Sequence, residues 1–122
     1  MSRQIMKKLF LVIMIFIMLV CLSACASIYV KGTVSSNTDN GDAILDIMPQ
    51  KIMEKANIGD TVTVSIGDFC EEMPFVDEMI KEDGKLQLFL DKNSWSITVC
   101  IYDQDFLKTY NIDLGEKVFI SK

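Results

Sequence analysis

The stretch Thr61-Val62-Thr63-Val64-Ser65-Ile66 alternates polar and β-branched apolar residues without a break. Alternation with a period of two places Val62, Val64 and Ile66 on one face of a strand and the polar residues on the other. A strand of this kind buries one face against a core, while its second face meets water. The stretch therefore predicts a β-rich domain with its core on one side of this strand.

Further segments of strand-like composition occur on both sides of residues 61–66. They are rich in β-branched and aromatic residues and are separated by turn signals such as Asn40-Gly41. These segments are residues 28–34, 43–48, 73–76, 86–90, 95–101 and 117–120. Six or seven short strands at this spacing predict a mainly β fold, either a small barrel or a sandwich.

Two short helical segments are expected in the connections between these strands. Residues 49–56 begin with a proline, which suits the first position of a helix, and Ile52 and Met53 are expected to face inward. Residues 105–110 predict one or two helical turns. The candidates for the N-cap of that helix are Asp103 and Asp105.

The region around Cys70 carries no clear strand pattern. Cys70 follows Gly67-Asp68 and precedes two glutamates, so a loop is expected there. The strand at residues 73–76 contains Pro74, which lacks a backbone donor, and we therefore expect this strand at an edge or a bend.

The N-terminus has the organisation of a bacterial signal peptide. Arg3, Lys7 and Lys8 precede an unbroken apolar run over residues 9–22. This run is shorter than the ~20 residues that a spanning helix needs, and it falls in the ~7–15-residue range of a signal-peptide core. The run closes in Leu22-Ser23-Ala24-Cys25, which resembles the lipobox of bacterial lipoproteins.

The lipobox resemblance implies cleavage between Ala24 and Cys25 and attachment of lipid to the Cys25 thiol. Two or more acyl chains anchor a protein stably, whereas one chain gives only marginal binding. The implied segments are a signal peptide (1–24), a short lipidated leader (25–30) and a folded domain (31–122). The domain would lie on the extracytoplasmic face of the cell membrane or outer membrane. The alternative, an uncleaved anchor helix extending to Val30, also places it outside the cytoplasm.

Residues 25–122 are strongly acidic and lack two residue types. They carry nine lysines and all seventeen acidic residues of the chain, a formal charge of −8, with no arginine and no histidine. Phosphate groups would be repelled, which argues against nucleic acid as a partner and against electrostatic binding of the domain to anionic lipid. Without histidine, neither a Ser-His-Asp nor a Cys-His catalytic site can form.

Neither the cysteines nor the acidic clusters of this region predict a metal site. Cys70 and Cys100 are too widely spaced in the sequence to form a metal-ligand pair. They could form one disulfide in an oxidising compartment, and two buried free thiols are the favoured alternative. The acidic clusters at residues 68–72 and 77–83 lack the spacing of a calcium loop, so we expect them to be solvated and predict no metal and no cofactor.

Two units of the chain share the pattern of glycine, an acidic residue, any residue and valine. They are Gly59-Asp60-Thr61-Val62 and Gly115-Glu116-Lys117-Val118. Between them lie segments at residues 74–76, 84–89, 94–99 and 105–112. In order and spacing this set resembles the C-terminal domain of the S-adenosylmethionine hydroxide adenosyltransferases, the family that includes the fluorinase and chlorinase. The resemblance covers residues 31–122.

That resemblance implies a small β-barrel that contacts the adenine and the methionine end of a substrate. The family's Asp-x-Phe-Gly-Asn loop corresponds to residues 38–42, where Gly41 keeps the pattern and Asp42 replaces the amide. A later serine turn corresponds to Ser94, and Trp95 beside it could stack on adenine or be an ordinary strand aromatic. The resemblance thus makes Asp42, Ser94 and Trp95 candidate ligand-binding residues.

Catalysis is not expected from this chain. In the resembling enzymes the catalytic polar residues come mainly from a larger N-terminal domain, and we expect that domain to be absent here. Two function classes remain. The preferred one is a structural or protein-interaction barrel whose acidic face or exposed strand edge meets another envelope protein. The alternative is a lipoprotein that binds a nucleoside or an S-adenosylmethionine-like ligand in a remnant of the substrate cleft.

Overall fold

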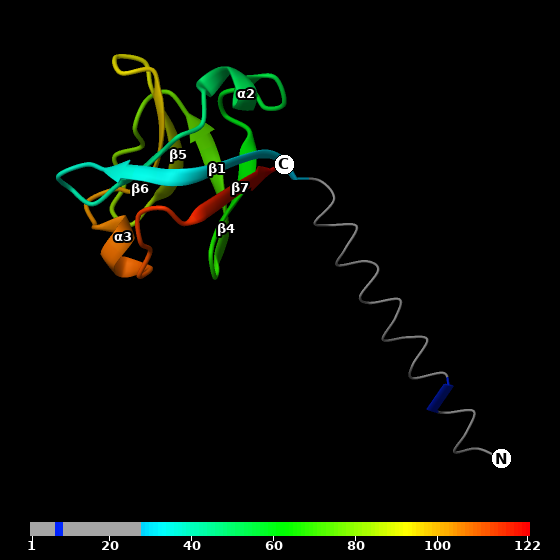
Figure 1. Cartoon of the computed structure of the whole chain (residues 1–122). Coiled ribbons are helices and arrows are strands. Elements are labelled where there is room, and N and C mark those ends of the chain that lie inside the picture. The colour runs from blue at the N-terminus through cyan, green and yellow to red at the C-terminus, as the bar shows by residue number, and fades with distance from the viewer. Residues whose placement is uncertain (1–6, 9–27) are drawn as a thin grey trace.

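The computed structural model describes residues 7–8 and 28–122, and residues 28–122 form a closed β-barrel with two short helices (Figure 1). The strands are β1 (Ile28–Asn37), β2 (Ala43–Leu45), β3 (Thr61–Ile66), β4 (Phe69–Val76), β5 (Leu86–Asp91), β6 (Ser96–Ile101) and β7 (Lys117–Ser121). The helices are α2 (Pro49–Met53) and α3 (Phe106–Thr109). The predicted mainly β fold is confirmed. The lipobox residues Ala24 and Cys25 lie outside the described residues.

The barrel closes in the order β1-β2-β6-β5-β4-β3-β7, with β7 pairing back to β1. Within the described barrel all neighbouring strands are antiparallel except β4 and β5, which the crossover at residues 77–85 joins in parallel. Closure leaves no edge strand among residues 28–122. Every strand thus has a neighbour on each side, which favours the acidic-face version of the interaction hypothesis over the version based on an exposed strand edge.

The period-two stretch forms β3, and its inward side chains lie in the core. Val62, Val64 and Ile66 are each at most 1% exposed, as the alternation predicted. The largest fully buried side chains around them come from other strands and from both helices. They include Phe75, Phe106, Ile52, Met73, Leu88, Leu90, Ile97 and Ile120. None of the described helices is long and apolar enough to span a bilayer.

Several strand boundaries differ from the predicted ones because pairing partners decide them. The polar residues Ser36 and Asn37 continue β1, since they pair with Ile44 and Ala43 of β2. β6 begins at Ser96, because Trp95 has a φ of 53° and belongs to the turn before it.

The prediction of a loop at Cys70 was wrong, because β4 already begins at Phe69, directly after a two-residue turn. Gly67, with a φ of 56°, turns the chain so that Phe69 pairs with Ile66 and Cys70 pairs with Ser65. The Phe69 ring then packs edge-on against Phe106, with ring centroids 5.2 Å apart. Burial of the Phe69 ring therefore stabilises the β3–β4 hairpin next to its turn.

Pro74 lies inside β4 and not at an edge or a bend. It pairs with Thr61 of β3 on one side. On the other side, the residues of β4 that pair in parallel with β5 are Phe75 and Val76, which follow Pro74. The donor that proline lacks is therefore not needed by that ladder.

A buried glutamine fastens the crossover between β4 and β5. Gln87 is fully buried, and its side-chain oxygen accepts a hydrogen bond from the Ile80 backbone N–H at 2.7 Å. Its amide nitrogen donates to the backbone oxygens of Ile80 and Lys85, at 3.1 and 3.4 Å. A buried amide needs such partners, so this residue fixes the path of residues 80–85.

The barrel has two ends that strand direction defines. We call the end where β1 begins the proximal end; Ile28 pairs there with Ser121, and the connections at residues 46–60 and 92–95 lie there by register. The other, distal end carries the loops at residues 38–42, 67–68 and 102–116. β1 runs from one to the other, roughly 30 Å at ~3.3 Å per residue.

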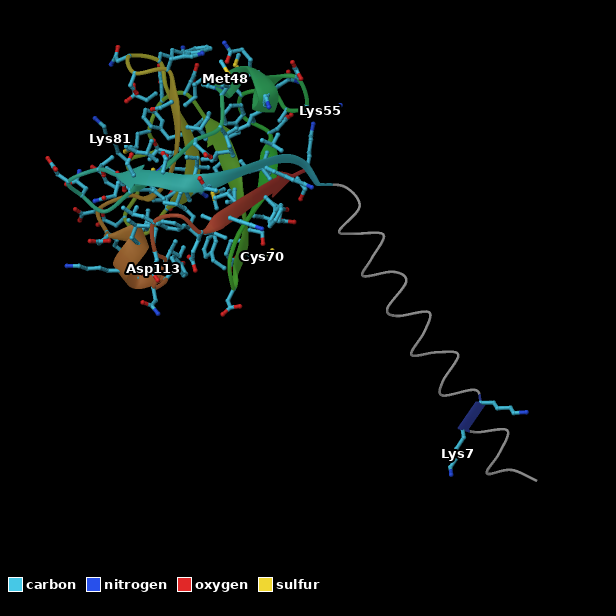
Figure 2. All side chains as sticks on the ribbon, in the orientation of Figure 1. Lys7, Met48, Lys55, Cys70, Lys81 and Asp113 are labelled. Carbon is cyan, nitrogen blue, oxygen red and sulfur yellow. The ribbon has the colours of Figure 1, made fainter. Side chains whose placement is uncertain are left out.

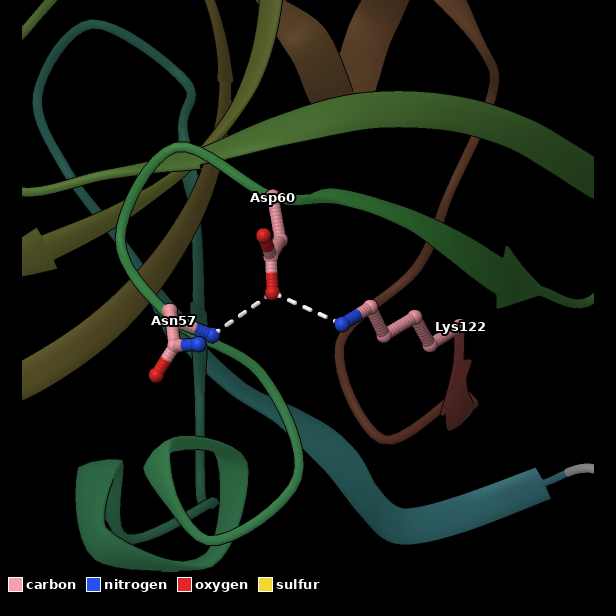
Figure 3. A network of polar contacts seen from close by, with 3 residues as sticks. All are labelled: Asn57, Asp60 and Lys122. Carbon is pink, nitrogen blue, oxygen red and sulfur yellow. Dashed lines mark hydrogen bonds and ion pairs between the residues drawn. The ribbon is translucent and has the colours of Figure 1, made fainter.

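A polar network ties the proximal connection to the end of β7 (Figure 3). The Asp60 carboxylate accepts a hydrogen bond from the Asn57 backbone N–H and forms an ion pair with the Lys122 ammonium, both at 2.8 Å. The Lys122 bond, together with that from Asn57, holds the pKa of Asp60 below its usual value. Residues 57–60 are thereby fixed against the C-terminal strand.

The helix α2 buries only one of the two side chains that were expected to face inward. Ile52 is fully buried, whereas Met53 is 44% exposed. A five-residue helix lying on the barrel surface covers only one side, so the expectation for Met53 was wrong.

Truncation of these two neighbours should therefore have very different effects. We expect Ile52→Ala to lower the free energy of unfolding by about 2–5 kcal/mol through a cavity. Met53→Ala should change it by about 0.5 kcal/mol or less. Urea denaturation of the two variants measures the difference, and equal losses would contradict this placement of α2.

Candidate functional site

A cavity of about 400 Å³ opens at the distal end of the barrel. It lies between the β1–β2 loop, the end of β6 and the segment that leads into α3. Its lining residues are Asn40, Asp42, Met79, Cys100, Ile101, Tyr102, Asp103, Gln104 and Asp105. The volume is within the range of small-molecule sites, about 300–1,000 Å³.

The β1–β2 loop is held in a tight turn by its own residues. The Thr38 backbone N–H donates to the Asp42 carbonyl at 3.1 Å, and the Gly41 N–H donates to the Thr38 carbonyl at 3.0 Å. The Thr38 hydroxyl accepts from the Asp42 N–H and donates to the Asp42 carboxylate, both at 3.1 Å. The threonine at position 38 thus fixes the carboxylate that faces the cavity.

Gly41 fits because no side chain has room there. Its φ is 86°, and a Cβ atom at this position would overlap the Asp105 carboxylate. Its carbonyl accepts from the Leu107 N–H at 3.0 Å. The glycine that the sequence singled out therefore joins the two walls of the cavity.

The segment that leads into α3 forms the second wall. Asp105 is the N-cap of α3, and its carboxylate accepts from the Lys108 N–H at 2.9 Å. Of the two predicted caps, Asp105 is thus the one used. Asp103 instead has a φ of 63° and lines the cavity as an exposed residue.

Two titratable groups of the cavity have shifted pKa values. Burial raises the pKa of Asp42, the Thr38 hydroxyl bond opposes this, and the Asp105 charge raises it further. Burial, with a smaller effect of the Asp42 charge, raises the pKa of the Cys100 thiol to about 12. Near neutral pH the Cys100 thiol is therefore protonated and is a poor nucleophile.

The chemistry of the cavity is that of hydrogen-bond acceptors. Three carboxyl groups and two side-chain amides suit a ligand with hydroxyl or amine donors, whereas a ligand carboxylate would be repelled. The amides of Asn40 and Gln104 were not predicted as site residues, because a polar loop residue gives no distinctive sequence signal. Within residues 7–8 and 28–122, no cluster of three or more histidine, cysteine or acidic side chains could hold a metal ion.

The three predicted ligand-binding residues do not share one site. Asp42 lines the distal cavity. Ser94 and Trp95 lie in the β5–β6 turn at the proximal end, at the opposite end of β6. There the Ser94 hydroxyl lies 2.7 Å from that of Ser96, and Trp95 is 44% exposed. The family resemblance suggested these three residues as ligand contacts, and strand direction places Ser94 and Trp95 at the other end of the barrel from Asp42.

Cys70 and Cys100 are both free thiols, and they differ in environment. Cys70 is exposed on β4, and Cys100 is 1% exposed on β6. The Cys100 Sγ lies 3.9 Å from the Gln87 carbonyl, to which it donates weakly. The two cysteines belong to different strand pairs, and the structure does not join them.

Comparison with known proteins identifies the fold and no activity. No protein-family profile and no curated protein matches the chain. A solved structure of an uncharacterized conserved protein from Thermotoga maritima is similar, with a TM-score of 0.67 and 16% identity over 75% of this chain and 36% of that one. A conserved hypothetical protein from Thermus thermophilus is similar with a TM-score of 0.54, at 16% identity, over 74% of this chain and 34% of that one. The chain thus spans about a third of the length of these neighbours.

The two thiols should differ sharply in alkylation rate. A pKa raised from 9.0 to about 12 lowers the thiolate fraction of Cys100 about a thousandfold near neutral pH. We expect iodoacetamide to label Cys70 in the folded protein, and Cys100 only after denaturation. Peptide mass spectrometry measures both sites in one sample. Equal labelling of the folded protein at the two cysteines would refute this description of the cavity wall.

Proposed function

We propose that the chain is a membrane-anchored extracytoplasmic lipoprotein whose β-barrel is a non-catalytic protein-interaction module. The observation that carries the proposal is Leu22-Ser23-Ala24-Cys25, whose cysteine lies three residues before Ile28, where β1 begins. A lipid on Cys25 would hold the start of β1 near the membrane, and the distal loop at residues 38–42 follows the other end of this ten-residue strand. The lack of histidine and arginine in residues 25–122 and the protonated Cys100 thiol support a non-catalytic role.

The charge of the distal end supports a basic partner. The three distal loops carry seven acidic residues and one lysine. The acidic residues are Asp39, Asp42, Asp68, Asp103, Asp105, Asp113 and Glu116, and the lysine is Lys108. Opposite charge on a partner speeds encounter and suppresses wrong partners. The partner class that fits is another envelope protein with a basic surface, and nucleic acid would be repelled.

Site-specific photo-crosslinking in intact cells tests the proposal. A photoreactive residue in place of Leu114, which is 54% exposed at the distal end, should give a discrete adduct with an envelope protein. The double variant Asp39→Asn and Asp103→Asn should reduce that adduct several-fold, because both carboxylates are exposed and would be free to meet a basic partner.

A matched pair outside the distal loops is the control. Glu54→Gln and Glu78→Gln remove the same charge from exposed positions elsewhere on the barrel, and they should leave the adduct unchanged. An adduct that is lost equally in both double variants, or no adduct at all, would count against a distal interaction surface.

The second candidate function is binding of a small ligand in the distal cavity. The observation that favours it is a cavity of about 400 Å³ with the Asp42 carboxylate fixed at its wall by Thr38. The resemblance of residues 31–122 to the C-terminal domain of the adenosyltransferases suggests a nucleoside-like ligand. The ribose hydroxyls of such a ligand are the donors that a carboxylate accepts.

A thermal-shift measurement with millimolar adenosine and S-adenosylmethionine tests this candidate. A ligand at 100 times its Kd stabilises the folded state by about 2.7 kcal/mol, so a bound nucleoside should raise Tm by several degrees. Asp42→Asn should reduce the shift, since it replaces one acceptor oxygen by a donor. No shift with wild-type protein at millimolar ligand rules the candidate out.

A further inference from the structure

Exposed apolar side chains are concentrated at the proximal end of the barrel. Six large apolar side chains of the described residues are more than a third exposed. Four of them lie in the proximal connections, namely Met48, Met53, Ile58 and Trp95, which are 59%, 44%, 41% and 44% exposed. The other two, Tyr110 and Leu114, lie at the distal end. Exposure of large apolar side chains to water is unfavourable, and apolar side chains gathered at one end of a domain commonly mark an interaction surface.

The proximal end also differs from the distal end in charge. The connections at residues 46–60 and 92–95, the start of the crossover at Asp77 and Glu78, and the C-terminal residue carry five acidic residues and four lysines, against seven and one in the distal loops. Among the described residues, Lys51 and Lys55 make no ion pair, and they flank the exposed Met53 in sequence. Figure 2 shows Met48 and Lys55 at the α2 end of the barrel. The expectation that an acidic domain avoids anionic lipid thus applies mainly to the distal loops, because acidic residues and lysines nearly balance at this end.

The short leader restricts where the proximal end can lie, if Cys25 is lipidated as proposed above. Cys25 precedes Ile28 by three residues, and a fully extended chain covers at most ~3.3–3.6 Å per residue. The start of β1 would therefore lie within about 10 Å of the lipidated cysteine. Residues 57–60 of the first proximal connection lie beside that point, because the Asp60 network ties them to the end of β7, which pairs with the start of β1.

We infer that the proximal end of the barrel docks on the phospholipid bilayer that holds its own anchor. Met48, Met53, Ile58 and Trp95 enter the interfacial layer. Tryptophan favours this layer because its ring is amphipathic, and apolar residues next to lysines are typical of surfaces that lie in it. Lys51 and Lys55 face the lipid phosphates, an attraction that anionic lipid strengthens. The barrel therefore stands end-on, with its acidic loops turned away from the membrane.

Trp95 is positioned for this contact by the β5–β6 turn. The Asp91 carboxylate accepts a hydrogen bond from the Asn93 N–H at 2.9 Å and holds the turn. Trp95 follows with a φ of 53° and presents its side chain outside the core. It is also the only tryptophan of the chain, so its fluorescence reports on this end alone.

Depth-dependent quenching of Trp95 tests the inference. The full-length product is purified from its host membranes and reconstituted in phosphatidylcholine and phosphatidylglycerol vesicles that contain a lipid quencher near the headgroup. Flotation first establishes that the protein is vesicle-bound. We expect the quencher to remove at least about half of the Trp95 emission, because an interfacial ring lies at its depth.

Matched variants separate docking from simple tethering. In Trp95→Phe with Leu114→Trp, the single tryptophan moves to the distal end, and quenching should become small. Met53→Ser with Ile58→Ser should weaken quenching of Trp95 without affecting flotation, since both side chains are exposed in the fold.

The outcomes distinguish this inference from the proposed function on which it rests. The docking is overturned if the protein floats with vesicles, while Trp95 of the wild type is quenched as little as the tryptophan of the Trp95→Phe, Leu114→Trp variant. The apolar end would then be left to a protein partner. A chain that does not float carries no lipid anchor, which overturns both the proposed function and the docking.

Discussion

Pairing of β1 with β7 is the interaction on which the rest of the structure depends. It closes the barrel, so each strand of the described residues has a neighbour on both sides. It also places Ile28 beside Ser121, which makes one end of the barrel the point where the preceding chain arrives. Because β1 is ten residues long, the same strand carries the chain to the distal loop at residues 38–42. Two ends with different surfaces follow from this one ladder.

The two ends divide the surface chemistry of the domain. Acidic residues are concentrated in the distal loops around a cavity whose two walls meet where Gly41 lies against Asp105. The proximal end has nearly balanced charge and holds four of the six exposed large apolar side chains of the described residues. A formal charge summed over the chain hides this division, because it averages a strongly acidic end with one that is nearly neutral. The proposed anchor at Cys25 gives the division a direction, with the acidic end facing away from the membrane.

Sequence periodicity predicted the strands well where one face is buried, as at Thr61–Ile66. It failed where long-range pairing or packing decides, because a short α2 covers Ile52 and leaves Met53 in water, and a tight turn at Gly67 draws Cys70 into a strand. Of the candidate ligand residues, only Asp42 lies at a cavity. The separation of the other two depends on strand direction across the whole barrel, which no local pattern encodes.

The proposed function depends on Cys25 being the lipidated first residue of the mature protein. The most direct test is the intact mass of the protein extracted from the membranes of its host. If Cys25 is lipidated, the mass equals residues 25–122 plus a diacylglycerol group, and fragment ions assign the addition to Cys25. A mass that includes Met1, or an unmodified Cys25 in the membrane-bound protein, would contradict the proposal.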